Sequence, residues 1–199
     1  MKSCLFQGTF NPPHNGHLYI AEFVLKNTEY DEIVFVPAYK PPHKSYREEN
    51  SFHRLKMTEL LAENKCGLRV SDIEFQREEP SYTYVTVKSL TDKKLISDSP
   101  AIIIGDDAFN NIESWYKTEE LKKTVKFLLM PRKDGITQEK LQILKEKGYN
   151  FIRLDMPFYD ISSTLIRDLI SKGMPTDNLI PDKIRKYIDE YSLYKHTDR

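Results

Sequence analysis

The chain has 199 residues, of which 39% are hydrophobic and 30% are charged, and its 30 lysines and arginines balance its 30 aspartates and glutamates. This length and composition are typical of one globular domain, and a net charge of zero provides no overall field that would attract nucleic acid or a membrane surface. Any anion site must therefore be a local cluster. Because the sequence has no apolar run of about 18 residues and no signal peptide, we expect a cytoplasmic protein without nucleic-acid or membrane partners. Cys4 and Cys66 are expected to be buried, reduced thiols.

Apolar runs alternate with amphipathic segments along the chain. The runs predict strands at 3–6, 32–37, 69–75, 100–104, 125–130 and 151–154. The amphipathic segments predict helices at 17–27, 52–64, 82–90, 137–147, 163–172 and 181–190, with short helices flanking Trp115. Ser51 is expected to cap the helix over 52–64, and Pro181 to be the first helical residue of the last helix. Residues 38–50 have no apolar periodicity, which predicts a functional loop.

This alternation predicts a doubly wound, Rossmann-like α/β fold, in which a parallel sheet carries helices on both faces. We treat residues 1–199 as a single domain, with the C-terminal helices of 163–194 packed on it. In such sheets ligands bind beyond the carboxyl ends of the strands. Segments 8–17, 37–44, 105–107 and 131–132 each follow a predicted strand, so we expect them to meet at one edge of the sheet.

The first of these segments, GTFNPPHNGH at 8–17, lies between a predicted strand and a predicted helix. The first N–H groups of a helix have no partner within it and the helix dipole is positive there, so this arrangement suits an anion. His14 and His17 add donors that can carry charge near neutral pH. They could instead be a satisfied loop pair or metal ligands, but a metal also needs a third ligand, and no acidic residue stands at a suitable spacing. We therefore favour a polyphosphate ligand and expect no protein-bound metal.

Several segments resemble one known family. GTFNPPHNGH resembles the first signature of the nucleotidyltransferases that share the His-x-Gly-His motif, most closely the nicotinate-nucleotide adenylyltransferases. The sequence ISSTLIR at 161–167 resembles their second signature, although serines at a helix start are usually caps. The tail at 173–194 resembles their C-terminal helix. The chain departs from the family pattern at Gln7, where the pattern has a glycine, and at Val85, where it has an acid.

The resemblance implies adenylyl transfer from ATP to nicotinate mononucleotide, which gives deamido-NAD and pyrophosphate in NAD biosynthesis. It also implies direct attack on the α-phosphorus, with Mg²⁺ bound together with ATP and with His14 and His17 as the catalytic residues. The ATP-binding residues that it implies are Gly8, Thr9, Phe10, His14, His17, Gly105, Asp107, Ile161, Ser162, Ser163, Thr164 and Arg167. The mononucleotide-binding residues that it implies are Lys40, Lys44, Tyr82, Thr83, Trp115 and Arg132.

Other interpretations remain open at this point. The segment from Lys40 to Lys44 could be a solvated charged loop, Trp115 a core aromatic residue and Arg132 a surface ion pair, while Asp106 is expected to be solvated. The acceptor could be nicotinamide mononucleotide, phosphopantetheine or flavin mononucleotide, and the same motif also serves cytidylyl transfer. The chain could also be a non-catalytic nucleotide-sensing module. Its oligomeric state is open, and a homo-oligomer is one alternative.

Overall fold

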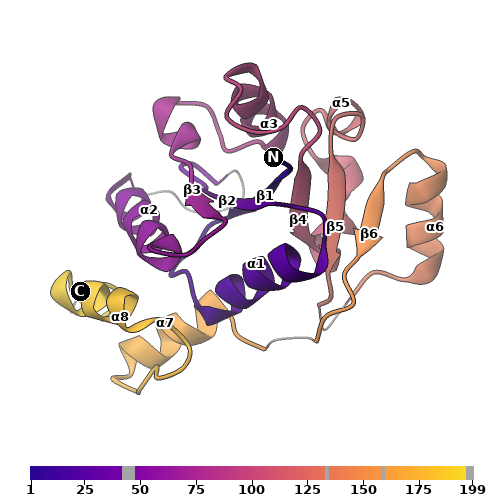
Figure 1. The fold of residues 1–199 in the computed structure, drawn as a ribbon. Coiled ribbons are helices and arrows are strands. Elements are labelled where there is room, and N and C mark those ends of the chain that lie inside the picture. The colour runs from indigo at the N-terminus through magenta and orange to yellow at the C-terminus, as the bar shows by residue number, and fades with distance from the viewer. Residues whose placement is uncertain (42–47, 133–134, 158–159, 196–199) are drawn as a thin grey trace.

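The computed structural model describes residues 1–41, 48–132, 135–157 and 160–195, and within these ranges six strands form one parallel sheet (Figure 1). The strands are β1 (Ser3–Gly8), β2 (Glu32–Pro37), β3 (Leu68–Val70), β4 (Ala101–Gly105), β5 (Lys126–Met130) and β6 (Phe151–Arg153). Their order is β3-β2-β1-β4-β5-β6, and every neighbouring pair is parallel. The winding direction reverses between β1 and β4, the position at which ligands bind in sheets of this kind.

Helices cover both faces of the sheet. They are α1 (Asn15–Asn27), α2 (Glu48–Ala62), α3 (Thr83–Asp92), α4 (Asp106–Phe109), α5 (Thr118–Leu121), α6 (Gln138–Glu146), α7 (Ser163–Ser171) and α8 (Asp182–Glu190), with 3-10 turns η1 (Ile73–Gln76) and η2 (Ile112–Ser114). The helices α1, α2, α7 and α8 share one apolar cluster, and the remaining helices and turns share the other. Figure 1 shows α8 lying beside α2, close to the C-terminus.

The strands are apolar along their whole length because both of their faces are buried. In β1 the side chains of Cys4 and Phe6 enter one cluster and that of Leu5 enters the other. In β4 Ile103 joins the first cluster and Ile102 the second in the same way. The apolar runs of the sequence therefore predicted these two strands correctly.

Four expectations about local structure are wrong. The strand expected over 69–75 ends at Val70, and η1 follows it. Ser51 lies inside α2, where its hydroxyl donates to the carbonyl of Tyr39 at 2.9 Å and does not cap the helix. Pro181 is the residue before the first helical turn, because its ψ of 146° is extended. Cys66 is exposed, whereas Cys4 is buried as expected, and both are free thiols.

Candidate active site

The loop after β1 owes its shape to Gly8 and Phe10. Phe10 has a positive φ of 49°, which turns its ring back over Gly8. A Cβ atom on Gly8 would lie 2.9 Å from that ring, so only glycine fits there without a shift of the ring. The Phe10 ring is buried between Phe6 and His17, with ring centroids 5.7 and 4.9 Å away. The sequence thus folds this loop tightly against the end of β1 and brings His17 to the same place.

His14 and His17 meet at the start of α1. His14 precedes the first helical residue, and its backbone N–H donates to Nδ1 of His17 at 3.2 Å. The two ring centroids are 3.7 Å apart. Because Nδ1 of His17 accepts a hydrogen bond, the neutral ring carries its proton on Nε2, which is then available as a donor to a ligand.

Burial keeps both histidines neutral in the free protein. Burial, with a smaller contribution from the positive charge of Arg132, lowers the pKa of His14 to about 4. Burial also lowers the pKa of His17 well below its usual value, with smaller contributions from His14 and Arg132. The expectation of charge near neutral pH is therefore wrong for the free protein. The pair presents neutral N–H donors, and a bound anion would favour their protonation.

The second signature lies directly against the first. The Ser163 hydroxyl donates to the carbonyl of Pro12 at 2.8 Å, across 151 residues of sequence. Arg167 donates through Nη1 to the carbonyl of Asn11 at 2.8 Å and through Nη2 to the Thr164 hydroxyl at 3.2 Å. Ser162 caps α7 by accepting the backbone N–H of Leu165 at 3.2 Å. Ser162 is therefore a cap, as the simpler interpretation holds, whereas Ser163 joins the two signatures.

The carboxyl ends of β4 and β5 supply Asp107 and Arg132. Nε of Arg132 lies 3.9 Å from Oδ1 of Asp107 at the protein surface. A Cβ atom on Gly105 would lie 2.3 Å from that same oxygen, so glycine allows the carboxylate to fold over the strand end. Arg132 also lowers the pKa of both histidines. The charge at the end of β5 therefore acts on the histidine loop after β1.

Asp106 is fully buried, so the expectation of a solvated side chain is wrong. Its Oδ2 lies 3.7 Å from Nη2 of Arg153, and within the described residues neither of its oxygens accepts a hydrogen bond. A Cβ atom on Gly135 would approach Oδ2 to 2.6 Å, which shows how closely the chain packs over this carboxylate. The turn from β4 into α4 directs the side chain inward, which residue type alone could not indicate.

The segments assigned to the mononucleotide also meet. The backbone N–H of Lys40 donates to the Ser81 hydroxyl at 3.0 Å, and the N–H of Ser81 donates to the Lys40 carbonyl at 3.0 Å. The Tyr82 ring stacks on Tyr116, with centroids 4.7 Å apart, just before α3 begins at Thr83. Trp115 is half-buried against the same apolar cluster as α3. Lys44 lies outside the described residues.

Comparison with known proteins assigns the family. The model of the cytidylyltransferase-like family matches residues 5–169. The nicotinate-nucleotide adenylyltransferase of Bacillus subtilis (strain 168) is 38% identical over 192 residues, which are 96% of this chain and 97% of that protein. The chain belongs to the nicotinate-nucleotide adenylyltransferase family. A probable nicotinate-nucleotide adenylyltransferase of Bacillus pumilus, at 40% identity over 192 residues, is a further member.

Solved structures of the same kind establish the fold. Nicotinic acid mononucleotide adenylyltransferase of Plasmodium falciparum, in complex with NaAD, has a TM-score of 0.78 to this chain at 24% identity, over 98% of both chains. The same protein complexed with APC has a TM-score of 0.76 at 22% identity. The predicted Rossmann-like parallel α/β fold is confirmed.

One residue that the sequence analysis missed is Arg54 of α2, which binds two of the loops at the carboxyl ends of the strands. It is 4% exposed and donates through Nη1 to the carbonyls of Thr9 at 2.8 Å and Ala38 at 2.6 Å. It therefore ties the loop after β1 to the loop after β2. Arg54 lies three and seven residues before the buried Met57 and Leu61, on one helical face, so an arginine on an apolar stripe was an available signal.

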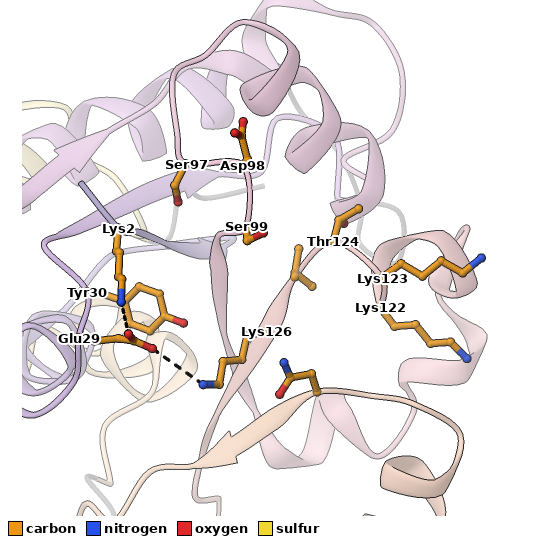
Figure 2. Close-up of a pocket in the computed structure, with 12 residues that line it drawn as sticks. Lys2, Glu29, Tyr30, Ser97, Asp98, Ser99, Lys122, Lys123, Thr124 and Lys126 are labelled. Carbon is orange, nitrogen blue, oxygen red and sulfur yellow. Dashed lines mark hydrogen bonds and ion pairs between the residues drawn. The ribbon is translucent and has the colours of Figure 1, made fainter.

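A cavity of about 520 Å³ lies at the opposite edge of the sheet (Figure 2). Figure 2 shows Lys2 and Lys126 directed at Glu29, with which both form ion pairs, while Lys122 and Lys123 extend away. The two inward ammonium groups are thus already paired, and the cavity is at the amino ends of the strands. The cavity therefore lies at the end of the sheet opposite to the family signatures.

None of the helices in the described ranges is long and apolar enough to span a membrane. Within those ranges, no three side chains of histidine, cysteine, aspartate or glutamate gather as metal ligands would.

Proposed function

We propose that this chain transfers the adenylyl group of ATP to nicotinate mononucleotide, which gives deamido-NAD and pyrophosphate in NAD biosynthesis. The observation that carries the proposal is the direct contact between its two signatures, in which Arg167 donates to the Asn11 carbonyl of the histidine loop. This contact places a guanidinium and two helix starts around one small region, and such groups recognise polyphosphates. The names of the relatives specify the reaction.

ATP is proposed to bind at the starts of α1 and α7. Its phosphates would lie on the loop of Gly8, Thr9 and Phe10, with His14 and His17 as donors. The second half of this site would be Ile161, Ser162, Ser163, Thr164 and Arg167, and Gly105 with Asp107 would hold the ribose. Asp107 suits this role because its carboxylate is exposed at the end of β4.

Catalysis is proposed to depend on positioning and on charge neutralisation. An oxygen of the mononucleotide phosphate attacks the α-phosphorus of ATP, and the bond from that phosphorus to the β-phosphate oxygen breaks. Negative charge builds on the departing pyrophosphate. Nε2–H of His17 and the ring of His14 would donate to it, since preorganised donors are most effective where charge develops.

Mg²⁺ is proposed to enter with ATP. This ion usually keeps several waters and takes phosphate oxygens as ligands together with one or two carboxylates. Within the described residues no three histidine, cysteine or acidic side chains gather at this edge, which suits an ion that takes most of its ligands from the ATP phosphates and water. When bound, the ion would neutralise phosphate charge.

Nicotinate mononucleotide is proposed to bind between the loop after β2 and the start of α3. Lys40, Lys44 and Arg132 would face its phosphate, and Trp115 would cover the ring. The nicotinate carboxylate would accept hydrogen bonds from backbone N–H groups at the start of α3, where Tyr82 and Thr83 lie and the helix dipole is positive. Val85 in place of an acid removes a negative charge from this helix, which also favours an anionic base.

A panel of acceptors tests the proposal. Pyrophosphate release is measured with ATP and Mg²⁺ against nicotinate mononucleotide, nicotinamide mononucleotide, flavin mononucleotide and phosphopantetheine, and the dinucleotide product is identified by mass. We expect the highest kcat/KM with nicotinate mononucleotide and deamido-NAD as product. A higher value with another acceptor would refute the assignment of the substrate. Binding of ATP without turnover of any acceptor would indicate a nucleotide-sensing module.

A further inference from the structure

Glu74 is a buried carboxylate beside the proposed mononucleotide site, and the reaction chemistry does not use it. It lies in η1, shortly after β3, and is 2% exposed. A carboxylate removed from water is destabilising unless donors surround it. The partners of Glu74 therefore indicate its role.

Those partners come from several segments at the same edge of the sheet. Oε2 accepts the backbone N–H of Tyr39, just beyond β2, at 3.2 Å. Oε1 accepts the Thr86 hydroxyl of α3 at 2.6 Å and Nε2 of Gln7 in β1 at 3.4 Å. Nη2 of Arg77 lies 3.6 Å from Oε1 and donates to the same Thr86 hydroxyl at 2.6 Å. All of these groups are donors, which an ionised carboxylate requires.

The anchored atoms adjoin the residues proposed to bind the mononucleotide. Lys40 follows Tyr39 directly, and its backbone is paired with that of Ser81. The Thr86 hydroxyl also lies 3.2 Å from the carbonyl of Tyr82, at the start of α3. A single carboxylate thus fixes the Lys40 loop relative to the start of α3.

We propose that Glu74 is a positioning residue for the mononucleotide half of the active site. It holds the loop after β2 and the start of α3 at the separation that the mononucleotide requires. The starts of α1 and α7, proposed for ATP, are joined by contacts of their own through Ser163 and Arg167. The inference rests on the proposed function, because that function assigns the mononucleotide to these segments.

The test compares two isosteric substitutions. Glu74→Gln keeps the shape but turns one acceptor into a donor, so at least one buried donor loses its partner. We expect the KM for nicotinate mononucleotide to rise about tenfold or more, because an unmatched buried donor is strongly destabilising. The KM for ATP should change less than about twofold, because Ser163, Arg167 and Arg54 hold the loop after β1 through contacts that this substitution leaves in place.

Glu32→Gln is the matched control at the other end of the sheet. Glu32 is 6% exposed at the start of β2, where it accepts the Ser3 hydroxyl at 2.7 Å and Nε of Arg69 at 3.2 Å. This variant should lower the melting temperature and leave both KM values unchanged. If Glu74→Gln does not fold, Thr86→Val removes one of the same contacts and should raise the same KM. An equal rise in both KM values, or the same selective rise in Glu32→Gln, would overturn the positioning role.

Hydrogen exchange separates this inference from the proposed function. Glu74→Gln should speed amide exchange at Tyr39 and in the first turn of α3, and Glu32→Gln should not. If the unmodified protein makes no deamido-NAD, the proposed function is refuted. The exchange rates at Tyr39 and in the first turn of α3 then decide by themselves whether Glu74 holds these two segments. Unchanged exchange at both places would overturn its positioning role even in an active enzyme.

Discussion

Exchanging His17 for asparagine or glutamine separates the two hydrogen bonds of this ring. Nδ1 accepts the backbone N–H of His14 at 3.2 Å, and Nε2 is the donor assigned to the leaving pyrophosphate. Asparagine is short enough to place its amide oxygen near the position of Nδ1 but offers nothing at Nε2. Glutamine reaches the position of Nε2 with its amide N–H and gives up the acceptor.

The expected magnitudes follow from these contacts. His17→Asn should lose about 10²–10³-fold in kcat, or about 2.7–4 kcal/mol, as when one donor to a developing oxyanion is removed. It keeps the capping contact, so it should lose less stability than His17→Gln, although both variants lose the packing of the ring on Phe10. His17→Gln should keep more of the turnover but lose about 0.5–2 kcal/mol of stability, because the start of α1 loses a capping contact.

Pyrophosphate release under saturating ATP measures kcat, and urea unfolding measures stability. An active but unstable His17→Asn, together with a stable but inactive His17→Gln, is the opposite result. It would refute the roles given to Nδ1 as the capping acceptor and to Nε2 as the donor to pyrophosphate. His17→Ala is less informative because it removes both hydrogen bonds at once, together with the packing of the His17 ring 4.9 Å from that of Phe10.

Three further predictions concern the same site. Arg167→Lys loses the planar fork that reaches the Asn11 carbonyl, so ATP should bind more weakly while mononucleotide binding stays nearly unchanged; separate titrations check this, and a defect confined to the mononucleotide would contradict it. Trp115→Ala should weaken nicotinate and nicotinamide mononucleotides alike, because stacking does not distinguish acid from amide; a collapse of their kcat/KM ratio would contradict this. The pKa of His14 is lowered from 6.5 to about 4, so the unfolded chain binds more protons than the folded one between these values. Stability from His14 is therefore present above about pH 6.5 and is lost toward pH 4, by up to about 3 kcal/mol, as measured by urea unfolding at each pH. His14→Gln should make this profile less steep but not flat, because the pKa of His17 is also lowered; a flat profile in the unmodified protein, or an unchanged slope in His14→Gln, would contradict this.

The strands were predictable because their signal is local. In β4, Ile102 and Ile103 are buried on opposite faces, so each residue reports its burial through its own side chain. The prediction for the segment after Val70 was wrong because its structure depends on partners that are distant in the sequence. Its alternation of apolar and polar residues looks like a strand, but Glu74 turns inward to bind Tyr39 and Thr86. Those partners are distant in the sequence, so no local pattern contains them.

The sequence predicted which segments form the site, but it did not predict the charge state of the histidines or the burial of Asp106. The residues of GTFNPPHNGH identified the loop, yet the charge state of His14 depends on burial and on Arg132, which lies far along the chain. Asp106 illustrates the same limit, since its burial follows from the packing of Gly135 and Arg153 around it. Arg54 could have been found by asking why a charged side chain occupies an apolar helical stripe.

The hydroxyl of Tyr194 donates to Oδ1 of Asn11 at 2.6 Å, across 183 residues of sequence. Burial raises the pKa of this phenol, so it remains a donor throughout the physiological range. During synthesis the histidine loop leaves the ribosome before its partners in α7 and at Tyr194 are made. The nascent chain can therefore form β1 and its loop early, but this loop reaches its final geometry only when translation has passed residue 194. Until then the nascent chain has not completed the site that we propose for ATP.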